Sequence, residues 1–260
     1  MNADPNQDIP RKLPASQGFQ WVNAGFRFYR KTPLLLSAAF GVIFGMVMAL
    51  GLIPGVGGAL SDLVWPLAVA GFMAAYRALD DGRELELPNF LAGVQGPAIP
   101  LMTIGAVQLL AMLVIGKIMI GMGFDPQALM DVAQRGDATP QDVQVVLNRS
   151  LPAVFTGLVL FAPLMMATWF APALILFGGA RPVTALGVSL KAVMRNWAPM
   201  LVNSLALGLL LFVSALVPFL LGLLVAMPIL FGSLYASYQA IFAVWADESP
   251  RGDQPADSLA

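Results

Sequence analysis

Five polar or ionisable side chains lie inside long apolar stretches of this sequence, where they could bind a solute or carry a proton. These candidates for an intramembrane polar path are Asp62, Gln108, Lys117, Asn203 and Tyr235. A charged group at the centre of a bilayer costs on the order of 2.5–3.5 kcal/mol to insert, so each position is a functional-site hypothesis. An Asp62–Lys117 pair in the outer half of the bundle would form a gate, although nothing in the sequence requires that pair.

Most of these candidates also have a structural interpretation. Lys117 is close enough to the end of its apolar stretch for its ammonium group to reach the interface. Asp62 follows Ser61 at the expected start of a helix, where both residue types favour N-terminal capping. Hydrogen bonds between membrane helices contribute about 0.6 kcal/mol each, so Gln108 and Asn203 could simply hold helices together.

Catalytic chemistry lacks its usual residues in this chain. The sequence has no His and no Cys, which removes the commonest general base, thiolate nucleophiles and the commonest metal ligands. No acidic pair has metal-ligand spacing, no Gly-rich phosphate loop is present, and Ser189, Ser204 and Ser237 have no basic partner. We therefore expect no catalytic residue, no cofactor and no metal ion. A net charge of −1 gives no support for nucleic acid as a partner.

The elements that position these residues follow from composition. The 260 residues are 58% hydrophobic and 11% charged, whereas soluble domains are about 45–50% apolar and about 25% charged. A bilayer core needs about 20 mostly apolar residues per helix. Six stretches meet this need: 33–54, 63–79, 97–122, 151–177, 197–218 and 219–245. The sequence predicts an all-α polytopic membrane helical bundle with six transmembrane helices.

The distribution of Lys and Arg predicts the orientation. Only Lys117, Arg135 and Arg149 fall on one side of the expected spans, which leaves 11 of the 14 cations on the other side (14 − 3 = 11). Cations concentrate in cytoplasmic loops of membrane proteins. We therefore expect a multi-pass protein of a bacterial cytoplasmic (inner) membrane with both termini in the cytoplasm.

Two amphipathic segments precede spans on the cytoplasmic side, at 17–31 and 181–195. Each ends in two cations one helical turn apart, and a proline and a span follow each segment. This pattern is typical of interfacial helices, with apolar side chains such as Phe19 and Phe26 in the lipid boundary and cations near the headgroups. The candidate contacts with lipid headgroups or a partner are Arg27, Lys31, Lys191 and Arg195.

An interfacial helix, an outward span and an inward span form a unit that recurs along the chain. The three predicted repeat units cover about 17–79, 84–177 and 181–246, of which the middle one is the weakest copy. The middle unit carries a periplasmic helical insertion at 123–149, in which Asp125-Pro126 and Thr139-Pro140 each open a short helix. We expect disordered cytoplasmic segments at 1–16 and 247–260.

Three motifs carry a resemblance to a known group of proteins. They are FAPAL at 170–174, SLKAVMRNWAP at 189–199 and YASYQAIF at 235–242. With these motifs the chain resembles an uncharacterised family of proteobacterial six-span inner-membrane proteins over most of residues 17–246. More distantly, it looks like the membrane domain found beside some bacterial glycerophosphodiesterases. The resemblance implies a helical inner-membrane protein and supplies no activity or site residue.

Three functions are compatible with these observations. The first is a non-enzymatic membrane protein that scaffolds or regulates partners, which are membrane lipids and possibly another membrane protein. The second is a transporter or channel for a small, possibly amphiphilic solute, which requires Gln108, Asn203 and Tyr235 to converge on one cavity. The third is a lipid-modifying enzyme, which would need Asp62 or the acidic outer loop to bind a metal ion.

Overall fold

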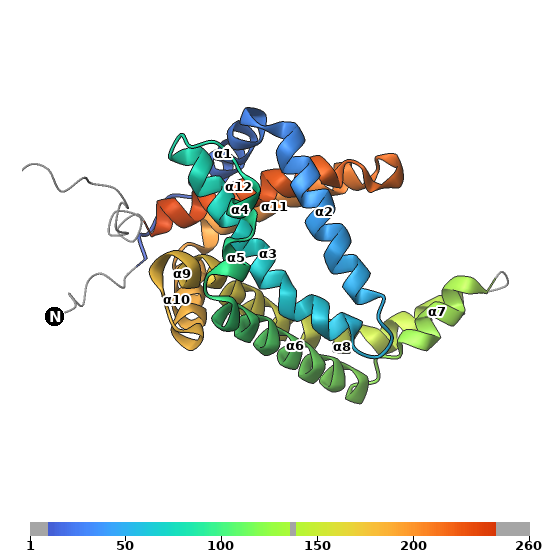
Figure 1. Ribbon diagram of the computed structural model, residues 1–260. Helices are drawn as coiled ribbons and strands as arrows, with labels where there is room; N and C mark the ends of the chain where they lie inside the picture. Colours follow the sequence, from blue (N-terminus) through green and yellow to red (C-terminus); the bar gives the residue numbers. More distant parts are fainter. Residues whose placement is uncertain (1–9, 136–138, 243–260) are drawn as a thin grey trace, which may run out of the picture.

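The computed structural model describes residues 10–135 and 139–242, and every regular element in these ranges is helical (Figure 1). The elements are α1 (Gln17–Lys31), α2 (Pro33–Gly51), α3 (Gly57–Asp80), α4 (Leu87–Phe90), α5 (Ala92–Gln95), α6 (Ala98–Gly121), α7 (Pro126–Gln134), α8 (Pro140–Trp169), α9 (Ala171–Gly178), α10 (Pro182–Arg195), α11 (Trp197–Ala215), the 3-10 turn η1 (Pro218–Leu220) and α12 (Leu223–Ile241). The sequence-based prediction of an all-α fold is confirmed.

Six of these segments are long and apolar enough to cross a membrane. They are α2, α3, α6, α8 together with α9, α11 and α12. Their bounds agree with the predicted spans to within a few residues, except at two N-terminal ends. The span that begins at α3 starts at Gly57, six residues before the predicted start. The fourth span starts at Pro140, within the predicted insertion.

The insertion differs from its prediction because its second helix is not separate. Thr139 and Asp142 form the predicted capping box, and the helix they open runs without interruption to Trp169. Pro152 lies inside this helix but does not end it. The first helix forms as predicted, since the Asp125 carboxylate accepts hydrogen bonds from two N–H groups of the first turn of α7. Figure 1 shows α7 and the start of α8 projecting beyond the other helices.

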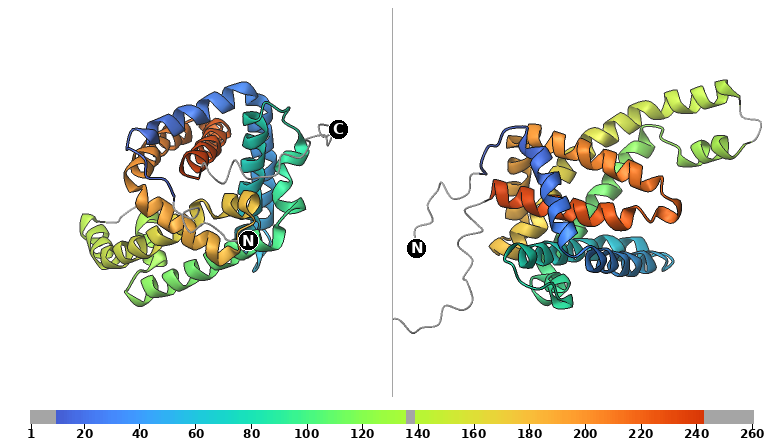
Figure 2. Two further views of the ribbon diagram at one scale, coloured as in Figure 1. Left: turned by 90° about the vertical axis from the view of Figure 1, so that its left-hand side faces the viewer. Right: turned by 90° about the horizontal axis from the view of Figure 1, so that it is seen from above.

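Five of the helices that are too short to span a membrane gather at one end of the bundle, which we call the terminal face. This face comprises α1, α4, α5, α9 and α10, together with the junction where Arg11 N–H donates to the Ile241 carbonyl. Figure 2 (left) views this face, and Figure 2 (right) shows α1 crossing α11 and α12. The opposite end, from which α7 projects, is the far face.

Each set of short helices packs on a long helix of another predicted unit. Helix α1 packs on α12 and α11, helices α4 and α5 pack on α3, and α10 packs on α8. Two of these contacts depend on glycine, because a Cβ at Gly25 would overlap the Ile229 carbonyl and a Cβ at Gly93 would overlap the Leu67 carbonyl. The arrangement is compatible with the predicted repeat, which remains a prediction.

The face of α1 that contacts the protein differs from the expected lipid face. Gly18, Trp21 and Gly25 are buried against α11 and α12, whereas Phe19 and Phe26 are 57% and 39% exposed. The helix is therefore held by the bundle along one side and presents its aromatic side chains outward along another.

The core lies toward the terminal face, where α3 and α12 meet. The Phe72 and Phe231 rings stack with centroids 4.5 Å apart, and Tyr76 and Tyr235 pack edge-on against Phe28 of α1. Aromatic pairs of this kind contribute about 0.5–1.5 kcal/mol beyond the area they bury.

Two features coincide with the break in the fourth span between α8 and α9: Pro172, which has no N–H to donate to the Thr168 carbonyl, and a side chain from a neighbouring helix. The Ser189 hydroxyl of α10 donates to the Met166 carbonyl at 2.8 Å and accepts from Phe170 N–H at 3.0 Å. It thereby occupies the position of one i→i−4 hydrogen bond of the helix, which is a recognised cause of kinks. The kink fixes α10 against the end of α8.

Candidate functional site

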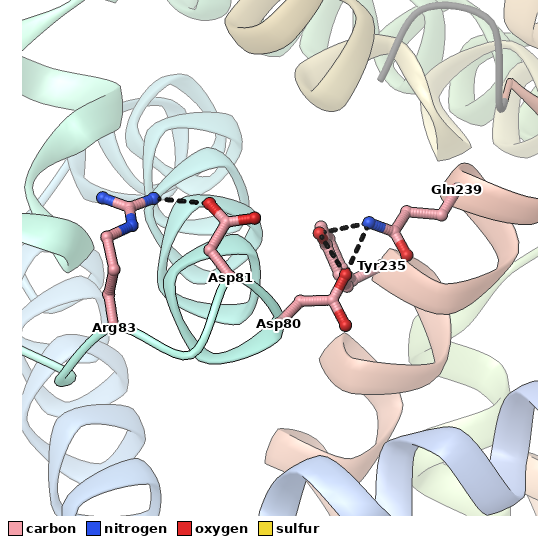
Figure 3. Close-up of polar contacts among 5 residues, drawn as sticks. All are labelled: Asp80, Asp81, Arg83, Tyr235 and Gln239. Carbon is pink, nitrogen blue, oxygen red and sulfur yellow. Dashed lines mark hydrogen bonds and ion pairs between the residues drawn. The ribbon is translucent and has the colours of Figure 1, made fainter. Parts of the chain in front are cut away.

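Tyr235 lies in a polar cluster at the terminal face (Figure 3). Its hydroxyl donates to Asp80 at 3.3 Å, and Gln239 donates to the same carboxylate oxygen at 2.8 Å and to the Tyr235 hydroxyl. Beside them, Arg83 pairs with Asp81 at 2.8 Å in an exposed ion pair. The cluster joins the end of α3 to α12, so Tyr235 contributes to the contact between two spans.

Asn203 lies in a different place, where α11, α12 and α1 meet. Its Oδ1 accepts a hydrogen bond of 2.7 Å from the Ser233 hydroxyl, and both side chains are fully buried. A Cβ at Gly18 of α1 would come within 2.8 Å of the Asn203 backbone nitrogen. The Asn203 amide nitrogen is buried without a partner among the described residues. The residue holds three helices together.

Gln108 is the one predicted polar candidate that lines the central cavity. This cavity has a volume of about 230 Å³ and lies between α3, α6, the α8–α9 kink and α12. Apart from Gln108 and Thr168 its wall is largely apolar and aromatic, with Trp65, Trp169 and Phe231. Gln108, Asn203 and Tyr235 therefore do not share one cavity.

Asp62 and Lys117 occupy two further places. Helix α3 begins at Gly57 with Val56 as its N-cap, so the expected capping role of Asp62 is wrong. The reason is that the helix begins six residues before the apolar stretch from which its start was predicted. Lys117 is exposed on α6. Asp62 and Lys117 do not form an ion pair with each other. The ion pair within residues 10–135 and 139–242 is Arg83–Asp81.

The four candidate headgroup cations have different surroundings. Lys31 donates a 2.8 Å hydrogen bond to the Leu79 carbonyl at the C-terminal turn of α3 and lies 5.5 Å from the Phe28 ring centroid. Arg27 lines a polar depression of about 410 Å³ that also includes Asp80 and Gln239. The other two cations, Lys191 and Arg195, are exposed on α10.

A second apolar hollow, which sequence reasoning missed, opens between α8 and α11. We call it the lateral groove. Its volume is about 440 Å³, and its lining residues are Phe161, Ala162, Met165, Met166, Trp169, Val193, Trp197, Met200, Leu201 and Ser204. It exists because α8 and α11 make no extended contact with each other, although each packs closely on other helices.

The lateral groove and the central cavity share a wall. Met165 and Trp169 line both, and the indole nitrogen of Trp169 is buried without a hydrogen-bond partner among the described residues. The signal in the sequence was the set of large flexible side chains, Met165, Met166 and Met200, on two stretches that otherwise look like ordinary spans. Methionine accommodates irregular gaps and variable occupants.

The part of the chain that the structure describes holds no group of three acidic residues that could bind a metal ion. Asp137 of the acidic outer loop lies outside the described residues.

Comparison with known proteins gives one informative relative. No family model matches the chain, and no solved structure matches it. A protein of Burkholderia thailandensis named "Probable inner membrane protein" is 28% identical, in an alignment that covers 92% of this chain and 96% of the relative. Together with six membrane-length apolar helices, this likeness supports a multi-pass inner membrane protein.

Proposed function

We propose that the protein is a non-enzymatic membrane protein that scaffolds or regulates membrane partners. The observation that carries this proposal is the use of polar groups inside the spans. Asn203 and Tyr235 take part in hydrogen bonds between helices rather than in a continuous path, and Gln108 lies apart from them. Polar side chains that form hydrogen bonds between the helices of the bundle are consistent with a structural role.

The terminal face offers the surface for a partner. Each of its three sets of short helices presents an apolar side chain outward: Phe19 of α1 is 57% exposed, Val94 of α5 is 57% exposed and Met194 of α10 is 60% exposed. Cations lie at the C-terminal half of α1 and next to Met194 on α10. Apolar side chains mixed with cations suit the cytoplasmic membrane surface, where anionic headgroups collect. We therefore place the terminal face, and both termini, in the cytoplasm.

Site-specific photo-crosslinking in cells tests this function. A photoreactive amino acid replaces Phe19, Val94 or Met194 in the full chain, and a matched substitution at Met130 of α7, 58% exposed, serves as control. We expect one discrete protein adduct from at least one terminal-face position and none from Met130. The proposal fails if no terminal-face position gives a discrete adduct, or if Met130 gives the same adduct.

The central cavity favours a second candidate function, the carriage of a small amphiphilic solute. Its specific support is Gln108, a polar group in a mostly apolar cavity that could orient such a molecule. Under this function, a small molecule that remains bound during gentle extraction is lost in Gln108→Leu and retained in Thr103→Leu, an exposed position of the same helix that lines neither the cavity nor the groove. If the parent protein itself retains no small molecule after gentle extraction, this candidate function loses its support.

A further inference from the structure

We propose that the polar depression lined by Arg27 and Asp80 binds a zwitterion, with the anionic group of that ligand at Arg27 and its primary ammonium group at Asp80. The ligand is a small unit in which an ammonium and a phosphate or carboxylate lie a few bonds apart. Its source is either the ethanolamine headgroup of a phospholipid or a free zwitterion such as phosphoethanolamine. This site goes beyond the scaffolding function and does not depend on it.

The depression lies between α1 and the last turns of α12, with the end of α3 beside them. Its α1 wall contains Gln17, Gln20, Ala24 and Arg27, which recur every three or four residues and therefore share one side of the helix. Its volume of about 410 Å³ lies in the usual range of roughly 300–1,000 Å³ for small-molecule sites. Because two spans, α3 and α12, end here, the depression lies at the terminal face, at the level of lipid headgroups.

A contact between α1 and α3 brings Arg27 and Asp80 to the same part of this depression. Lys31 donates a 2.8 Å hydrogen bond to the carbonyl of Leu79, the residue that precedes Asp80. Lys31 follows Arg27 by one helical turn, and residues one turn apart are neighbours on a helix surface. A guanidinium and a carboxylate therefore line one depression of the protein surface.

The Asp80 carboxylate is held in position from inside the bundle. One of its oxygens accepts hydrogen bonds from the Tyr235 hydroxyl at 3.3 Å and from the Gln239 amide at 2.8 Å. Tyr235 is 1% exposed, so the carboxylate is anchored to a side chain of the core. The other carboxylate oxygen accepts no hydrogen bond from the described residues and is left for a ligand. A carboxylate that is already fixed loses less conformational freedom on binding, which favours affinity.

The two opposite charges in the depression are not neutralised by the rest of the described chain. The ion pair in this part of the chain is Arg83–Asp81, so Arg27 and Asp80 pair neither with each other nor with another described residue. A simple anion at Arg27 would meet the negative charge of Asp80, and a simple cation at Asp80 would meet the positive charge of Arg27. A ligand that carries both charges matches both side chains at once. Charge complementarity therefore favours a zwitterion over a simple ion.

Binding of matched probes by the delipidated full-length protein in nonionic detergent tests the class of ligand and its source. For a free zwitterion, calorimetry should show phosphoethanolamine binding roughly fivefold more tightly than ethanolamine or inorganic phosphate, each of which carries one of its two charges. For a headgroup, native mass spectrometry should show phosphatidylethanolamine retained roughly fivefold better than phosphatidylcholine of the same chains, whose trimethylammonium group has no N–H to donate to Asp80. Discrimination by the lipids alone identifies a headgroup. The absence of discrimination in both measurements would overturn the proposal.

Two matched pairs of variants test the residues. Arg27→Gln and Asp80→Asn should each lower binding of the zwitterion that discriminates by roughly fivefold. The asparagine still offers an oxygen to the Tyr235 hydroxyl, so the contact between α3 and α12 is kept. Arg30→Gln and Asp81→Asn remove the same charges from residues that do not line the depression, and they should leave binding within about twofold. Thermal unfolding of all four variants checks that they are folded, and equal losses in a variant and its matched control would overturn the proposal.

Discussion

Neighbouring hairpins meet in two different ways in this bundle. Helices α3 and α6 pack closely, whereas α8 and α11 leave a gap between them. At the first, Gly105 of α6 lies so close to α3 that a Cβ would overlap the Asp62 carbonyl, and Leu101 and Ile104 are at most 1% exposed. At the second, methionine and tryptophan side chains stand on both helices, and Trp197 remains 65% exposed.

The difference shows that side-chain size decides whether two helices of this bundle pack closely or leave a gap. Without a hydrophobic driving force between helices in lipid, close approach depends on small residues that let the backbones touch. Gly105 provides this for α3 and α6, whereas Gly208, on the α11 side of the gap, has no atom near the place of a Cβ. Large flexible side chains line the second pair, and the lateral groove lies between the two helices.

Gly105→Leu should break the closed contact and have the largest effect. The new side chain would meet the backbone of α3, which cannot move aside, so we expect the free energy of unfolding to fall by about 3 kcal/mol or more. Unfolding in mixed micelles with a rising fraction of denaturing detergent measures the change. Gly116→Leu on the same helix, where nothing lies within 4 Å, is the control and should change stability little. Equal losses in the two variants would contradict the role of close approach.

Ser189→Ala should weaken the contact between α10 and the end of α8, which forms one wall of the gap. Removing the hydroxyl lets Phe170 N–H pair directly with the Met166 carbonyl, so the loss of stability should stay near 1–2 kcal/mol. Pro172 remains in the variant, so we expect the kink to persist and the loss of stability to report the two Ser189 hydrogen bonds alone. Thr184→Ala, at an exposed position of α10, is the matched control, and unfolding of both variants in mixed micelles measures the difference. Equal stability in the two variants would contradict a role of Ser189 in joining α10 to α8.

Ala162→Leu should have the smallest effect, because it enlarges a side chain in the open gap. The position is exposed and lines the groove, so stability should stay within about 0.5 kcal/mol. Ala153→Leu enlarges a fully buried side chain on the same helix and should cost about 2 kcal/mol. Thermal unfolding of both variants in detergent measures the contrast. A large loss in Ala162→Leu would mean that α8 and α11 pack together more closely in the membrane.

Apolar runs were sufficient to predict the six spans, because a bilayer demands long uninterrupted stretches. Local chemistry was also readable: Asp125 and Thr139 cap helices as predicted. The buried face of α1 was harder to predict, because Gly18 and Gly25 carry no hydrophobic signal and their partners come about 180–200 residues later. Pro172 is a local signal for the α8–α9 kink, whereas the hydrogen bonds that Ser189 contributes there come from another helix and could not be predicted. The lateral groove exists because α8 and α11 do not pack closely on each other. No local sequence pattern predicts that two helices will stay apart.

The docking of α1 across α11 and α12 has a consequence for biogenesis. Gly25 lies against Ile229, which is 204 residues later in the chain (229 − 25 = 204), and synthesis at about 5–20 residues per second takes roughly 10–40 s to cover that distance. Until α11 and α12 have been inserted, α1 lacks the two helices on which it mainly packs. The side of α1 that carries Gly18 and Gly25 is then accessible to quality-control factors. Helix α1 thus completes its packing only after α12 has been made, and a chain that ends before α12 leaves Gly25 without its packing partner.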